Sequence, residues 1–170
     1  DTAFVLRGRI YGAFGKMKDA EKDFNSAAKL NPNNYKIDFY RGYNQVNNGD
    51  CTDGKKSLIN YVKTEKKDVK AYYMLAFAYD CLDNIDSAIT CLKAVIRLTD
   101  EDPNRCKDSC RVFAFTNLGR LTGEKGDFEL SAHYYTEAGK CTSQPSCGLL
   151  LELGIAYYKS EQYNLAIDTL

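Results

Sequence analysis

The chain has 170 residues, and its 23 Lys and Arg residues balance its 23 Asp and Glu residues, so the formal net charge is zero. Binding to a nucleic-acid backbone or to an anionic membrane draws on an excess of cations, so we expect neither partner. Apolar residues make up 44% of the chain, as in a folded domain. With one histidine, His133, the sequence indicates no metal, cofactor or catalytic site, and we expect no enzyme activity.

The seven cysteines, an odd number, form no C-x-x-C pair, and the chain has no N-x-[ST] glycosylation sequon. These features favour reduced thiols in a cytoplasmic protein. A cytoplasmic location here includes membership of a cytoskeletal or ciliary assembly. A disulfide or metal site stays open for two closely spaced pairs, Cys106 with Cys110 and Cys141 with Cys147.

The predicted elements are helices that repeat in pairs. Three series of residues share the spacings 34, 34, 43 and 35. The first series is small (Gly8, Gly42, Ala76, Gly119, Gly154), the second is small (Ala20, Gly54, Ala88, Ser131, Ala166), and the third is bulky (Phe24, Leu58, Leu92, Tyr135, Leu170). Within each repeat, apolar residues three to four apart predict two helices that pack closely at the small positions.

In chain order, the pattern predicts five helix pairs. They cover 2–15 with 18–31, 34–48 with 51–65, 68–82 with 84–98, 108–124 with 127–140, and 147–160 with 162–170. Each of the three prolines falls at a boundary between repeats, where a helix is expected to end. The spacing of 43 places extra residues before the fourth repeat, near Cys106 and Cys110, as a longer loop or as a contact element for a partner.

A 34-residue helix–turn–helix unit with this pattern resembles the tetratricopeptide repeat family. The first repeat carries its motif in Phe4, Gly8, Tyr11, Ala20, Phe24, Ala27 and Pro32. Arg7 departs from the family's usual Leu, and in the second repeat Asp38, Arg41 and Gln45 replace apolar residues.

The resemblance implies an all-α fold, a right-handed α-solenoid of stacked antiparallel helix pairs. We expect a single array over residues 1–170, with repeats near 1–34, 35–68, 69–102, 112–146 and 147–170 and an insertion near 103–111. We also expect the array to be part of a longer protein, since it starts and stops without a capping helix.

In this family, the first helix of each pair lines a concave groove, mainly through positions 2, 5, 9 and 12 of each repeat. By this resemblance the groove carries a strip of four aromatic residues, Phe39, Tyr43, Tyr73 and Phe77, beside the cations Arg9, Lys36, Lys70 and Arg120. An exposed aromatic patch is typical of a binding site, but aromatic residues at helical spacing also form cores, and both interpretations stay open.

The sequence therefore predicts a non-catalytic scaffold that binds a protein, as a peptide or helix, in its groove. Two alternatives stay open: an architectural segment of a larger solenoid of the ciliary, transport or cell-cycle type, and a regulatory part of an enzyme whose catalytic domain lies elsewhere. The carboxylate clamp that holds heat-shock chaperone tails is incomplete in every register, because only Lys70 matches in the first, so we do not expect that partner.

Overall fold

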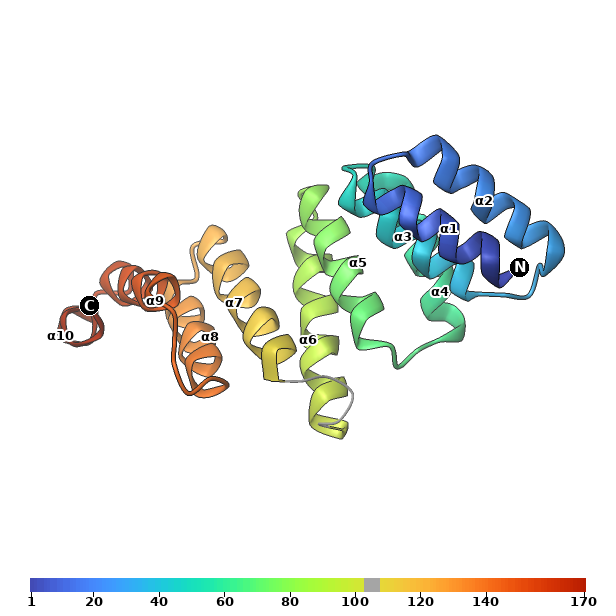
Figure 1. Cartoon of the computed structure of the whole chain (residues 1–170). Coiled ribbons are helices and arrows are strands. Elements are labelled where there is room, and N and C mark those ends of the chain that lie inside the picture. The colour runs from blue at the N-terminus through green and yellow to red at the C-terminus, as the bar shows by residue number, and fades with distance from the viewer. Residues whose placement is uncertain (103–107) are drawn as a thin grey trace. The chain divides into compact units, whose positions relative to one another are not determined.

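The computed structural model describes residues 1–102 and 108–170, and the described regions are built from α-helices joined by short turns (Figure 1). The helices are α1 (Thr2–Ala13), α2 (Met17–Leu30), α3 (Lys36–Asn47), α4 (Cys51–Thr64), α5 (Val69–Cys81), α6 (Ile85–Glu101), α7 (Asp108–Glu124), α8 (Phe128–Lys140), α9 (Cys147–Lys159) and α10 (Tyr163–Thr169). Within the described ranges, none of them combines the length and the apolar character that crossing a membrane needs.

The described helices form two compact units, Asp1–Ala88 and Ile89–Leu170, and the boundary between them falls inside α6. Each unit is treated by itself below. The single array predicted for residues 1–170 stays a prediction.

In the first unit, neighbouring helices pack as the repeat pattern predicts. Helix α1 packs on α2, α3 packs on α4 and on both earlier helices, and α5 packs on α3 and α4. One cluster of buried side chains joins the first pair to the second, and it consists of Val5, Ala20, Phe24, Ala27 and Ile37. Three of these residues belong to the family motif, so the apolar stripes are the core.

The small positions lie where paired helices cross. A Cβ atom on Gly8 would lie 2.9 Å from Cε1 of Phe24, and one on Gly42 would lie 2.9 Å from the carbonyl oxygen of Gly54. In the second unit, a Cβ on Gly119 would lie 2.9 Å from the ring of Tyr135. The predicted reason for the small residues is therefore confirmed: the opposing helix occupies the space of a side chain.

In the second unit, α7 packs on α8, α8 on α9, and α9 on α10. Helix α6 continues to Glu101, three residues past its predicted end at 98, and α7 begins at the predicted residue, Asp108. The first three residues of the predicted connection, 99–101, are therefore helical. The central part of the insertion, including Cys106, lies outside the described residues.

Candidate partner-binding site

The four residues of the predicted aromatic strip come from α3 and α5, which contact each other in the first unit. Tyr43 is 44% exposed and Phe77 is 49% exposed, whereas Phe39 and Tyr73 are half-buried. The structure thus divides the strip between the two interpretations: two rings reach the surface, and two also serve packing. Desolvation by this burial raises the pKa of Tyr73.

Phe39 is held in place by a tyrosine that the sequence analysis did not single out. The ring of Tyr61 in α4 lies 5.0 Å from that of Phe39, and Tyr61 is 6% exposed. Its hydroxyl donates a hydrogen bond to Oδ2 of Asp68 at 2.6 Å, and burial together with this bond raises the pKa of Tyr61. Tyr61 occupies the repeat position of Ala27, and this bulky residue at a small position was the signal that could have found it.

The predicted cations of the first unit also lie at the surface. The guanidinium carbon of Arg9 lies 4.3 Å from the ring centroid of Tyr40, while Lys36 and Lys70 are exposed. Neither lysine forms an ion pair with any residue that the structure describes. Of the charged residues at the groove positions of the first three repeats, Asp80 is the single carboxylate, so cations prevail there.

Arg120, the eighth predicted site residue, belongs to the second unit, whereas the other seven belong to the first. Its Nη1 lies 2.7 Å from Oε1 of Glu124, one helical turn later in α7. An ion pair of this kind neutralises part of the charge that a partner would meet. Arg120 is therefore the weakest of the predicted binding residues.

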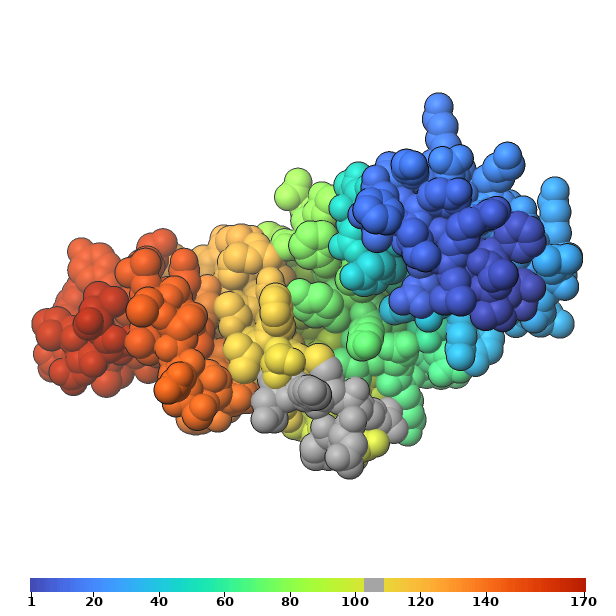
Figure 2. Space-filling view, viewed as in Figure 1, coloured from blue at the N-terminus to red at the C-terminus, as the bar shows by residue number. Residues whose placement is uncertain are grey.

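The second unit has a surface cavity of its own, of about 770 Å³. Its walls come from the start of α7, from the turn between α8 and α9, and from the start of α9 (yellow to red in Figure 2). Phe113, which is 56% exposed, Thr116 and Gly148 line it, and all three stand at positions that line the groove in the family.

Arg7, which stands where the family usually has Leu, is paired with a second polar residue, Asp23. Arg7 donates from Nε and Nη2 to the two carboxylate oxygens of Asp23, each at 2.7 Å, and Asp23 is only 3% exposed. The hydrogen bond from Arg7 lowers the pKa of the Asp23 carboxyl below its usual range. The two residues lie on facing helices of one pair, so a charged contact replaces the usual apolar one.

The polar departures of the second repeat hold helices together. Arg41 forms ion pairs with Glu21 at 2.9 Å and with Asp38 at 3.5 Å. The hydroxyl of Ser57 in α4 donates to Oε1 of Gln45 in α3 at 3.0 Å. These residues serve packing between and within repeats, which leaves the strip and its cations as the candidate site.

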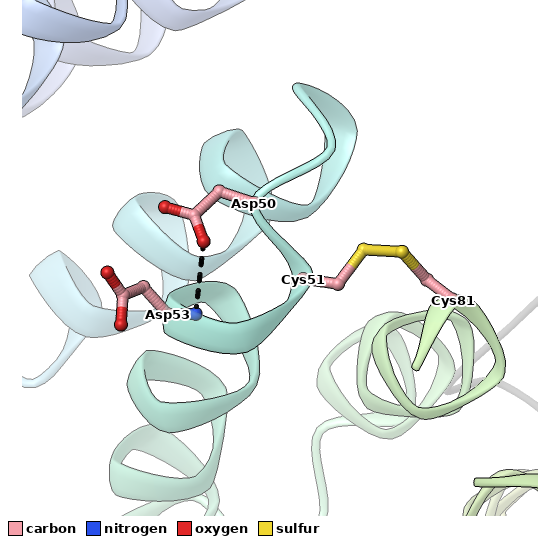
Figure 3. Close-up of a disulfide and its surroundings, with 4 residues drawn as sticks. All are labelled: Asp50, Cys51, Asp53 and Cys81. Atoms are coloured by element: carbon pink, nitrogen blue, oxygen red, sulfur yellow. Dashed lines mark hydrogen bonds between the residues drawn. A yellow bond between two sulfur atoms is a disulfide. The ribbon is translucent and has the colours of Figure 1, made fainter. Parts of the chain in front are cut away.

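The expectation of reduced thiols is wrong for Cys51 and Cys81, which form a disulfide (Figure 3). Cys51 begins α4 and is buried, and Cys81 ends α5 and is exposed. Cys110 is also disulfide-bonded, whereas Cys141 and Cys147 are free. The bond between Cys51 and Cys81 joins helices of two successive repeats, 30 residues apart in sequence, which spacing alone did not reveal.

Comparison with known proteins supports the predicted family and fold. Residues 2–34 and 69–102, close to the first and third predicted repeats, match the tetratricopeptide repeat model. No curated protein matches the chain significantly.

Among solved structures, the chain is similar to MamA, with a TM-score of 0.83 and 20% identity over 99% of this chain and 86% of that one. It is similar to PilF of Pseudomonas aeruginosa, with a TM-score of 0.76 and 13% identity over 99% of this chain and 72% of that one. It is also similar to YrrB, described as a TPR protein with an unusual peptide-binding site, with a TM-score of 0.77 and 13% identity over 98% and 80%. The fold is thus the all-α tetratricopeptide repeat fold.

Proposed function

We propose that the chain is a non-catalytic scaffold whose first unit binds an extended or helical protein segment along α3 and α5. The observation that carries the proposal is the exposure of Tyr43 and Phe77. They occupy the same position, the ninth, in the first helices of two successive repeats. Large exposed rings give much contact area at a low entropic cost, and such residues carry a large share of binding energy at interfaces.

The charges at the other groove positions of the first unit indicate the chemistry of the partner. Arg9, Lys36 and Lys70 are exposed, stand at groove positions and lack carboxylate partners among the described residues. Cations of this kind attract an acidic segment and raise its association rate. The partner segment that fits best therefore carries Asp or Glu together with aliphatic or aromatic side chains.

This proposal can be tested with peptides selected from a random phage-displayed library against the whole chain. A selected dodecapeptide, labelled with fluorescein, is titrated with the protein and followed by fluorescence anisotropy. We expect Tyr43→Ala and Phe77→Ala each to weaken binding by roughly tenfold, the effect of losing one central aromatic contact. Reversal of charge at Lys36 and Lys70 should weaken binding at low salt more than at high salt.

The matched control is Phe113→Ala, which removes an exposed ring of the same kind from the second unit. We expect it to leave the affinity unchanged. Circular dichroism of each variant shows whether the helices remain. If Phe113→Ala abolishes binding and the two strip variants do not, the cavity of the second unit is the binding site and the proposal is wrong.

The cellular location is a further part of the proposal. The sequence favoured the cytoplasm because it suggested reduced thiols, and that premise fails for Cys51 and Cys81. Disulfides persist in oxidising compartments. We therefore propose that the chain works in an oxidising compartment or meets oxidising conditions during its function.

A further inference from the structure

The cysteines of the disulfide lie close in sequence to the exposed residues of the aromatic strip. Phe77 precedes Cys81 by four residues, so the two share one face of α5. Cys51 follows the turn after α3, and Tyr43 lies four residues before the end of that helix at Asn47. Figure 3 shows the bond joining the start of α4 to the end of α5. It therefore ties the end of α5, the helix of Phe77, to the start of α4, which follows α3 and Tyr43 after one short turn.

The junction between the first two repeats is held in another way at the same end. There, Nδ2 of Asn44 donates to the carbonyl oxygen of Gly8 at 3.2 Å, and Nδ2 of Asn48 donates to that of Gly12 at 3.3 Å. These amides stand at positions 10 and 14 of the second repeat.

The third repeat has Ala78 and Leu82 at those two positions, so it has no amides to make the same bonds. The Cys51–Cys81 disulfide stands at this junction in their place. A cation–π contact also joins the same two helices, with Nζ of Lys55 lying 5.5 Å from the ring centroid of Tyr79, and it is weaker than a covalent bond. The covalent bond is thus the strongest constraint on this end of the junction.

We propose that this disulfide is a redox lock on the strip: its reduction loosens α5 against the packed pair of α3 and α4 and lowers the affinity for the partner segment. The inference rests on the proposed function, since it concerns regulation of the same surface. A rigid surface binds more tightly because less freedom is lost on binding. A surface whose two rings move independently loses that advantage.

The chemistry requires a dithiol reductant, such as dithiothreitol or a protein with two vicinal thiols. One of its thiolates attacks Sγ of Cys81, which is the exposed partner of the bond. The bond between the two sulfur atoms breaks, and its electron pair leaves with Sγ of Cys51, which takes a proton from water. The second thiol of the reductant then attacks the mixed disulfide and releases Cys81 as a thiol, while the dithiol becomes a disulfide.

The test compares the oxidised chain, the chain reduced with dithiothreitol, and the double variant C51A C81S. Hydrogen exchange of the amides of α3 and α5, without peptide, reports the lock alone, and anisotropy of the selected peptide reports affinity. We expect faster exchange at the ends of α3 and α5 and an affinity loss of roughly fivefold or more in both opened forms. The same reductant added to the double variant shows any effect of reducing Cys110, and C147S controls for loss of a free thiol.

The outcomes separate the lock from the proposed function. Unchanged exchange in both opened forms overturns the lock, and so does faster exchange with unchanged affinity. If the double variant does not fold, the reduced wild-type chain decides between the same outcomes. A chain that binds no selected peptide when oxidised contradicts the proposed function, whereas the exchange measurement still decides whether the bond holds the two helices.

Discussion

At the residue scale, polar side chains at apolar repeat positions come with polar partners. Asp23 illustrates this, because its carboxylate is buried next to the core and accepts two hydrogen bonds from the exposed side chain of Arg7. Removal of Arg7 alone leaves the buried carboxylate without its partner, which is more costly than replacing both residues.

We predict that Arg7→Leu, which restores the family's usual residue, lowers the melting temperature at pH 7. In the wild type, Arg7 depresses the pKa of Asp23, so the pair stabilises the fold above the unfolded-state pKa of about 3.9. This stabilisation is lost as the pH falls through the lower folded-state pKa. The difference in melting temperature between variant and wild type should therefore shrink toward pH 3.

The double variant R7L D23A is the control, because it removes both charges. Its melting temperature should lie above that of R7L at pH 7. Equal melting temperatures of R7L and the wild type across this pH range would show that the pair does not stabilise the fold.

The helix crossings give a second prediction at this scale. Gly42→Ala places a Cβ 2.9 Å from the carbonyl oxygen of Gly54 and against Leu58, which cannot retreat because it is buried. We expect a loss of about 1–3 kcal/mol in the free energy of unfolding, measured in urea. Gly139→Ala is the matched control, since a Cβ there meets nothing within 4 Å, and it should be neutral or slightly stabilising.

At the scale of the elements, the same turn joins the two helices in each of the five repeats. The residue at the fifteenth repeat position has a positive φ in every repeat: it is Gly15, Gly49, Asp83, Gly126 or Glu161. Glycine adopts this left-handed backbone without the steric cost that other residues bear.

Gly49→Ala should therefore destabilise the first unit by about 1 kcal/mol, since its φ is +88° and no atom crowds its Cβ position. The reverse change, Asp83→Gly, should stabilise by a smaller amount, because Asp tolerates this conformation better than most residues. Urea unfolding of both variants measures the two effects. A stability gain in Gly49→Ala would contradict the assignment of a strained turn.

The helices themselves were predictable, because the repeat pattern acts at many positions at once. Nine of the ten predicted helices end within two residues of their observed bounds, and α6 extends three residues further. The pairings of Arg7 with Asp23 and of Arg41 with Glu21 were not predictable in the same way. These pairings depend on which residues of two helices face each other. The periodicity of one helix shows which of its own residues share a face, but not what lies opposite them.

At the scale of the whole molecule, a disulfide between Cys51 and Cys81 joins the second repeat to the third. Seven cysteines allow many pairings, and the repeat spacing favours none of them. The sequence also did not show which residues of the strip are exposed. Whether Phe39 is exposed depends on Tyr61 of the neighbouring helix, which packs beneath it.

Removal of this disulfide in C51A C81S should lower the free energy of unfolding of the first unit. By closing a loop of about 30 residues, the bond lowers the entropy of the unfolded chain, and this stabilises the folded unit by roughly 3.5 kcal/mol. Hydrogen exchange of the amides of the first unit, measured at increasing urea concentrations, gives the size of this loss. A loss confined to the second unit would contradict the assignment of this bond to the first.

The central claim is that the face formed by α3 and α5 binds a protein segment, and a footprint tests it most directly. Hydrogen exchange of the oxidised chain is measured with and without a saturating selected peptide. The account predicts slower exchange in α3 and α5, around Tyr43 and Phe77. Protection confined to α7 and α9, or to the helices α2 and α4 on the other side of the pairs, would contradict it.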